Sequence, residues 1–169
     1  MNPICTIVES DIIKAAIQKY NSYGSEWEKA YFDELSGGFN VYHKEHQFAS
    51  TGGGGEAEKI VGKMLAKLGK QVEFLPEGGN KSADLLFDNQ TWDIKYIEKA
   101  SEHRMRDAIL DSRKADNAMF YFVSDSQFVK LMSAIYREVG NFLKKNKINQ
   151  LPNIYYMDKN GFLKLLWEK

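Results

Sequence analysis

The chain has 169 residues, a mass of 19.4 kDa, and 23 basic and 23 acidic side chains that cancel to a formal net charge of zero. This length fits one domain with a buried core and makes no case for two full domains. An apolar fraction of 43% with only three prolines excludes a long disordered or collagen-like chain. No apolar run approaches the roughly 18 residues of a spanning helix, and residues 1–9 lack a signal-peptide pattern. We therefore expect a globular protein with no membrane span, and the single cysteine, Cys5, is consistent with the reducing cytosol.

The zero net charge hides a gradient along the chain. Residues 1–58 carry nine acids and four lysines, a local balance of −5, whereas residues 95–150 carry eleven bases and seven acids, a balance of +4. Attraction to phosphate depends on local potential, so a neutral total does not exclude a nucleic-acid partner. The alternative is that these charges are ordinary solvated helix faces.

The first fifty residues predict a helical segment. Ser10 is a helix N-cap, and the residues after it place apolar side chains at helical spacing up to Tyr20. Residues 25–35 predict a second helix, since aromatic and apolar residues recur every four positions before two glycines. Residues 39–48 predict a short strand. We expect residues 1–50 to pack as an N-terminal helical segment on an α/β core formed by residues 51–169.

Helical and strand-like periods alternate in the rest of the chain. Four consecutive glycines at 52–55 lead into an amphipathic stretch that Gly69 closes. The period then changes to that of strands, with turn signals between them. The predicted elements are a helix at 56–68, a strand at 72–75, a hairpin of 83–87 and 91–97, a helix at 101–116, a strand at 118–123, a helix at 126–145 and a hairpin of 154–157 and 162–167. The order predicts a single α/β domain with a mixed sheet flanked by helices.

The first of these hairpins contains the residues best suited to chemistry. Side chains alternate along a strand, so Asp93 and Lys95 share one face. With residues 89–90 at the centre of the turn, Lys95 lies opposite Asp84 and Asp93 lies opposite Leu86. Opposed Cβ atoms lie roughly 5 Å apart, which brings the three polar groups together.

Two carboxylates so close repel each other and need a compensating positive charge. Lys95 supplies one charge, and a Mg²⁺-like ion held by Asp84 and Asp93 would supply more. Such an ion would polarise a phosphoryl oxygen and activate a bound water, while Lys95 orients that water or stabilises the transition state. The alternative is an exposed polar face with a weak cross-strand ion pair.

The order of these features resembles the PD-(D/E)XK nuclease superfamily over residues 55–123, roughly 40% of the chain. In that superfamily an acid on the first core helix joins an Asp at the start of one strand and a D/E-x-K on the next. By position Asp84 matches the first Asp, Asp93 the D/E and Lys95 the lysine. Ala83 stands where the superfamily name has proline.

The resemblance also implies an acid on the helix at 56–68, where two are available. Such helices tend to read E-x-x-(A/V)-x-x-x-L-x-x-x-G, and Glu58, Val61, Leu65 and Gly69 fit this register. Glu58 is therefore the expected catalytic and metal-binding acid. Glu56 remains the alternative, and it also suits the positive end of the helix dipole.

Within the superfamily, the segments GFNVYHK at 38–44, KSADLL at 81–86 and TWDIK at 91–95 resemble C-terminal toxin domains of bacterial contact-dependent growth inhibition systems and related phage proteins. This resemblance implies a nuclease that uses a divalent metal, Mg²⁺ or Mn²⁺ rather than Zn²⁺, and often acts on tRNA. It implies a cognate immunity protein, a cytoplasmic site of action and delivery from another cell as part of a larger secreted protein. RNA and DNA substrates both stay open, because the contacts that distinguish them are not readable from sequence.

Basic residues after the second strand of the hairpin are candidates for phosphate contacts. His103 could also take part in proton transfer, although a solvated helix start explains it equally simply. The predicted nucleic-acid-binding residues are Lys99, His103, Arg104, Arg106, Arg113 and Lys114. His43 and His46 lie in a strand-like stretch, and we interpret them as surface or loop residues.

Two other functions remain open from sequence. One is a metal-independent ribonuclease toxin that uses Lys, His and Arg side chains. The other is a nuclease-like domain that only binds nucleic acid or a protein.

Overall fold

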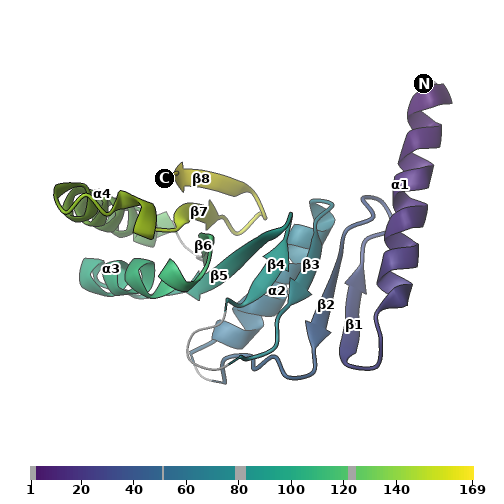
Figure 1. Cartoon of the computed structure of the whole chain (residues 1–169), viewed down its shortest axis with the longest axis horizontal. Coiled ribbons are helices and arrows are strands. Elements are labelled where there is room, and N and C mark those ends of the chain that lie inside the picture. The colour runs from purple at the N-terminus through teal and green to yellow at the C-terminus, as the bar shows by residue number, and fades with distance from the viewer. Residues whose placement is uncertain (1–2, 51, 79–82, 122–124) are drawn as a thin grey trace.

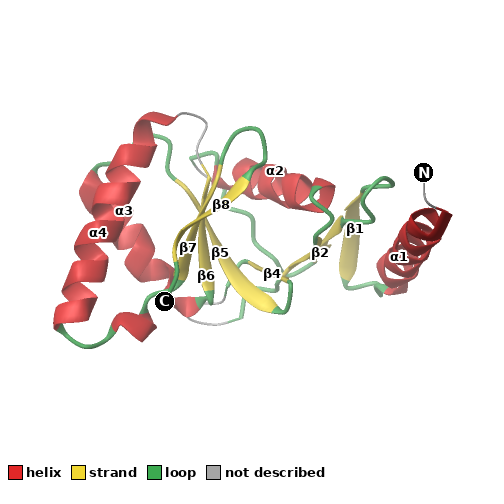
Figure 2. Ribbon diagram, turned by 90° about the horizontal axis from the view of Figure 1, so that it is seen from above, coloured by secondary structure: helices red, strands yellow, loops and turns green. Residues whose placement is uncertain are grey.

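The computed structural model describes residues 3–50, 52–78, 83–121 and 125–169, which form one mixed sheet with helices on both faces (Figures 1 and 2). Within these ranges the sheet has eight strands and the chain has four α-helices. The helices are α1 (Pro3–Ser22), α2 (Gly54–Lys67), α3 (Glu102–Asp111) and α4 (Phe128–Lys144), and the strands are β1 (Trp27–Phe32), β2 (Phe39–His43), β3 (Gln71–Phe74), β4 (Leu85–Phe87), β5 (Gln90–Tyr96), β6 (Asn117–Tyr121), β7 (Asn153–Met157) and β8 (Leu163–Trp167). The predicted α/β class with a mixed sheet is confirmed.

The strands lie in the sheet in the same order as in the chain. Helix α2 joins the parallel pair β2 and β3, while α3 and α4 make the parallel connections from β5 to β6 and from β6 to β7. The remaining neighbours pair antiparallel. From α2 to β6 the order is therefore helix, three strands, helix and strand, as the sequence predicts.

Two apolar clusters form the core, one on each face of the sheet. Successive side chains of β6 alternate between them, so Ala118 and Phe120 face α3 and α4, whereas Met119 and Tyr121 face α2. All four are buried, as expected for a strand covered on both faces. Helices α2 and α3 therefore approach β5 from opposite sides (Figure 2).

The predicted helix at 25–35 is wrong, because this segment contains strand β1, which pairs antiparallel with β2. Residues four apart share a face in a strand as well as in a helix, so the spacing that predicted a helix is ambiguous. Contacts across the sheet edge decide the outcome: Trp27 pairs with His43 and Phe32 pairs with Phe39. Segment 1–50 thus contributes two strands to the sheet in addition to α1.

Helix α1 lies at the β1 edge of the sheet (Figure 1), and Ala16 in its C-terminal half is buried. The Tyr20 ring lies 5.3 Å from the rings of both Phe32 and Phe39. Just after the helix, the Tyr23 hydroxyl donates a hydrogen bond to Glu73 of β3. None of the helices in the described ranges has the length and apolar character needed to span a lipid bilayer.

The register of the β4–β5 hairpin differs from the predicted one. Asp88 and Asn89, with φ of 52° and 57°, form the turn, and Leu85 pairs with Trp92. Two left-handed residues make the kind of tight turn whose twist matches that of the strands. Each partner is therefore two positions earlier than predicted, which places Asp93, and not Lys95, opposite Asp84.

Other boundaries also differ. Helix α1 begins at Pro3, so Ser10, predicted as its N-cap, lies inside the helix. The helix predicted at 101–116 ends at Asp111 and continues as a short 3₁₀ helix, η1 (Ser112–Lys114). Strand β6 ends at Tyr121, and the rest of the predicted strand, 122–123, lies outside the described residues. The early end of α3 matters for the site, because it turns η1 back toward β5.

Candidate active site

Two carboxylates lie side by side at the start of the β4–β5 hairpin. The Asp84 backbone N–H donates to the Trp92 carbonyl at 2.9 Å, which continues the hairpin pairing by one position. The Ile94 N–H donates to Asp84 Oδ2 at 2.6 Å and holds that side chain against β5. Asp93 is almost completely buried, with 1% of its side chain exposed. The sequence predicted this meeting of Asp84 and Asp93 on one face, although through a different register.

Asp93 is surrounded by positive and hydroxyl groups. Lys95 Nζ lies 2.8 Å from Asp93 Oδ2, and the Ser112 hydroxyl donates to the same oxygen at 2.6 Å. Lys114 Nζ lies 3.0 Å from Asp93 Oδ1. Lys95 also contacts Asp111 Oδ2 at 2.6 Å, so it bridges β5 and the end of α3. These contacts form one network, buried at Asp93 and open to solvent at Asp111, which we call the Asp93 network.

The pKa values of the two carboxyl groups shift in opposite directions. Burial, followed by the charge of Asp93, raises the pKa of Asp84 to about 7. Burial also opposes ionisation of Asp93, but the charge and hydrogen bond of Lys95, with help from Ser112 and Lys114, lower the Asp93 pKa below its ordinary value. Burial works against charge on Lys95 too, yet Asp93 and Asp111 raise its pKa. At neutral pH the site therefore holds a charged Lys95, an ionised Asp93 and an Asp84 close to its midpoint of titration.

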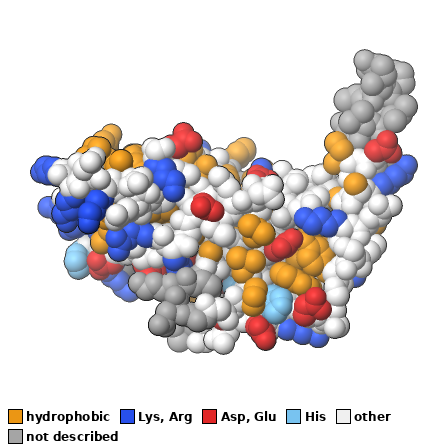
Figure 3. Space-filling model, in the orientation of Figure 1, with side chains coloured by type: hydrophobic (Ala, Val, Ile, Leu, Met, Phe, Trp, Pro, Cys, Tyr) orange, Lys and Arg blue, Asp and Glu red, His pale blue; other side chains and the backbone are white. Residues whose placement is uncertain are grey.

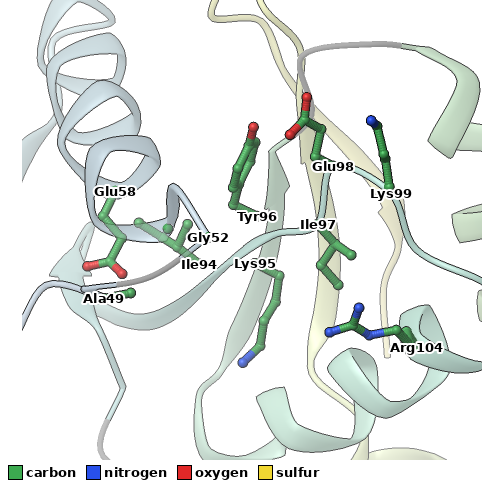
Figure 4. A pocket seen from close by; sticks show the side chains of 11 residues that line it. Ala49, Gly52, Glu58, Ile94, Lys95, Tyr96, Ile97, Glu98, Lys99 and Arg104 are labelled. Carbon is green, nitrogen blue, oxygen red and sulfur yellow. The ribbon is translucent and has the colours of Figure 1, made fainter.

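Glu58 of α2 and Lys95 of β5 line the same cavity (Figure 4). The Glu58 carboxylate lies 3.1 Å from His46 Nε2, and His46 Nδ1 lies 2.7 Å from the Leu75 carbonyl. Burial lowers the pKa of His46, but the Glu58 and Leu75 hydrogen bonds outweigh it and raise the pKa. The other helix acid, Glu56, is 78% exposed and pairs with Lys59 at 3.5 Å. Of the two acids only Glu58 lines the cavity.

This cavity has a volume of about 530 Å³ and lies between the start of α2, the end of β5 and the start of α3. Glu58, Lys95, Lys99 and Arg104 all line it. A second hollow of about 320 Å³ shares Lys95 and Arg104 and extends along α3 to Asp111. Lys95 and Arg104 thus line both hollows, so a chain of phosphates could pass both side chains.

The six predicted nucleic-acid-binding residues separate into different environments. Lys99 and Arg104 line the cavity, as described above. Arg106 forms an ion pair with Glu138, and the Arg113 Nε donates to the Leu110 carbonyl at 2.9 Å. His103 is exposed and lies 3.4 Å from Asp107. The Lys114 ammonium belongs to the Asp93 network.

The side chains of the site can be compared with the ligands that a bound metal ion requires. Among the described residues, no group of three or more His, Cys, Asp or Glu side chains is arranged to hold a metal ion. Mg²⁺, however, is usually held by one or two carboxylates with water and substrate phosphate completing its shell. Asp84 and Asp93 supply two such carboxylates, and among the described residues a single ammonium, that of Lys114, faces Asp93 Oδ1. Glu58 lies across the cavity, held by His46.

Several members of the site were missed at the sequence level. His46 was interpreted as a surface or loop residue; it does lie in a loop, but its side chain is only 2% exposed and it orients Glu58. Asp111 and Ser112 reach Lys95 and Asp93 only because α3 ends at Asp111. No local pattern marks them. Their role depends on where α3 lies against β5.

Comparison of the chain with models of known families, with curated proteins and with solved structures finds no match.

Proposed function

We propose that the chain is a metal-dependent nuclease of the PD-(D/E)XK type that hydrolyses phosphodiester bonds, with RNA, and tRNA in particular, as the favoured substrate. The observation that carries this proposal is the contact of Lys95 with buried Asp93, beside Asp84 and at the wall of a cavity that Glu58 also lines. The order of elements from α2 to β6 supports the assignment, because a helix that carries Glu58 precedes the strand that carries Asp93 and Lys95, and a helix and a parallel strand follow it.

Each side chain has a role that its environment supports. Asp84 and Asp93 would hold the cation, which would polarise a phosphoryl oxygen and make a bound water acidic. Lys95 remains charged because two aspartates stabilise its ammonium, so it can stabilise negative charge that develops on the phosphate. Arg104 lines the cavity next to Lys95 and is placed to hold a neighbouring phosphate. Glu58, fixed by His46, would complete the acidic side of the site.

The resemblance to toxin domains extends the proposal to biology. In this proposal the chain acts in the cytoplasm of a target bacterium, is delivered as part of a larger secreted protein and is neutralised by a cognate immunity protein. Expression of the unprotected chain inside bacteria should therefore arrest growth, and the arrest should require Lys95 and Asp93.

The direct test uses the purified chain with tRNA, bulk RNA and duplex DNA, each with Mg²⁺, Mn²⁺, Zn²⁺ or EDTA. We expect cleavage of RNA with Mg²⁺ or Mn²⁺ and none in EDTA. Lys95→Met should reduce the cleavage rate by about 10²- to 10³-fold, the usual effect of removing one group that stabilises transition-state charge. Lys70→Met is the matched control, because Lys70 also pairs with an aspartate, Asp88, but lies outside the site. Failure to cleave any of the three substrates would contradict the proposal.

One observation favours a second function, a metal-independent ribonuclease. Asp93 already carries two ammonium groups and a hydroxyl, so the Asp93 network balances its charge with the protein's own side chains. In that mechanism Lys95 and Arg104 would stabilise the transition state by themselves. The EDTA arm separates the two functions, because full activity in the chelator would support the second and overturn the first.

A further inference from the structure

Lys114 occupies an unexpected place for a residue at the end of a helix. It is the last residue of η1, yet its side chain is only 17% exposed because it turns inward to Asp93. Its ammonium contacts Oδ1, while Lys95 and Ser112 contact Oδ2. The two lysines thus divide the two carboxylate oxygens of Asp93 between them.

Lys114 affects both carboxylates of the site. Its charge helps to lower the pKa of Asp93, and it also opposes the rise in the pKa of Asp84. Among the described residues, the Lys114 ammonium is the positive group that contacts Asp93 Oδ1, at 3.0 Å. A divalent cation bound to the same pair of carboxylates would therefore compete with this ammonium for Oδ1.

The structure offers Lys114 another position. Lys114 also lines a hollow of about 580 Å³ on the outer side of η1, together with Arg113 and Asp116. A lysine side chain has four flexible bonds and can turn into such a space without movement of the backbone. Lys95 lacks this freedom, because Asp93 and Asp111 hold its ammonium from two sides.

We propose that Lys114 is a positioning residue that competes with a divalent cation for Asp93 and leaves Asp93 when the cation binds, an inference that rests on the proposed metal-dependent function. Lys114 keeps the buried carboxylate paired in the metal-free protein and weakens the affinity for the cation. The affinity for the divalent cation therefore depends on Lys114 of η1 as well as on Asp84 and Asp93.

The experiment measures Mn²⁺ binding to the full chain by isothermal titration calorimetry, without substrate. We expect Lys114→Met to bind Mn²⁺ about tenfold more tightly than the wild type, since it removes one partly screened competing charge. Lys114→Arg keeps the charge and should retain an affinity close to that of the wild type. Lys70→Met makes the same substitution at another ion pair and should leave the affinity unchanged.

Thermal unfolding gives a second readout that does not depend on activity. In EDTA, Lys114→Met should unfold at a lower temperature than the wild type, because Asp93 loses one of its two cationic partners. Added Mn²⁺ should raise its melting temperature more than it raises that of the wild type. This measurement also shows directly whether each variant is folded.

The outcomes separate this inference from the proposed function. Equal or weaker Mn²⁺ binding by a folded Lys114→Met variant, with binding by the wild type intact, overturns the role of Lys114 alone. If neither the wild type nor the variant binds Mn²⁺, the metal-dependent function fails and the inference fails with it. Asp93→Asn is the negative control, since it should remove Mn²⁺ binding from both the wild-type chain and the Lys114→Met variant.

Discussion

Asp84 is the residue whose ionisation depends most on the state of the site. Burial and the charge of Asp93 raise its pKa from 3.8 to about 7. The folded chain therefore binds more protons than the unfolded chain between these two pH values, and the contribution of Asp84 to stability decreases as the pH rises through this window. A cation held by Asp84 and Asp93 would offset the burial and the repulsion from Asp93 that disfavour the ionised Asp84 carboxylate.

The substitution Asp84→Asn tests that charge balance. In EDTA at pH 8 the variant should melt at least roughly 3 °C above the wild type, the shift that about 1 kcal/mol produces in a chain of this size. At pH 4 the difference should disappear, because the wild-type carboxyl is then protonated in the folded state. Thermal unfolding followed by circular dichroism measures both values. Asp88→Asn, at an exposed turn position, is the control, and the same pH dependence in both variants would contradict the prediction.

Strand parity explains how much of the site could be predicted from sequence. Asp84, Asp93 and Lys95 share a face in both the predicted and the observed register, because a shift of two positions preserves alternation. His46 and Ser112 could not be found in this way, since each reaches the site through a loop or a helix end. Their positions depend on tertiary packing, which leaves no periodic signal in the chain.

At the scale of elements, strand β2 lies unusually close to the end of α2. A Cβ atom on Gly38 would lie 1.9 Å from the Ala66 carbonyl oxygen, closer than any two such atoms can approach. Phe39 N–H donates to the Lys70 carbonyl at 3.0 Å at the same junction. This contact fixes β2 against α2, and the loop after β2 carries His46 to Glu58.

Gly38→Ala should therefore destabilise the fold. We expect a loss of about 1–3 kcal/mol, the usual cost of forcing extra atoms into a packed region, and more if α2 cannot move. Urea unfolding measures the change. Gly140→Ala is the matched control, because no atom lies within 4 Å of its added Cβ and alanine favours the helix by up to about 1 kcal/mol. Equal stability of Gly38→Ala and the wild type would show that the junction is looser than the structure indicates.

Elements were predictable where a period was long and unambiguous. The stripe of α4 and the turn-bounded strands β7 and β8 are confirmed with shifts of a few residues. Segment 25–35 was wrong because a four-residue spacing fits both a helix and a strand, and only pairing with β2 decides between them. The sequence therefore predicts elements best where they do not depend on a partner at the sheet edge.

At the scale of the whole molecule, 23 basic and 23 acidic side chains give a net charge of zero, but the basic ones are not evenly spread. On the face shown in Figure 3, Lys and Arg gather over the end of the molecule that carries α3 and α4. Some basic residues of α3 and α4 have acidic partners, including Arg106 with Glu138 and Arg137 with Glu102. Lys99 and Arg104 line the cavity and form no ion pair with any described residue. Lys144, Lys145 and Lys147, at and just after the end of α4, are exposed as well, so Lys99 and Arg104 are distinguished by their place in the cavity that Lys95 also lines.

An RNA footprint confined to Lys99 and Arg104 of the cavity predicts a shallow salt dependence for RNA binding. Two phosphate contacts correspond to a slope of about −1.4 in a plot of log K against log salt for a single strand, and Arg104→Gln should reduce it to about −0.7. Fluorescence anisotropy of a labelled single-stranded RNA with the chain in EDTA measures the slope. Arg113→Gln is the control, because Arg113 donates to a backbone carbonyl and lies over the Phe142 ring. An equal change in slope for both variants would mean that RNA also follows the outer side of η1, and a slope near −5 would contradict a footprint confined to the cavity.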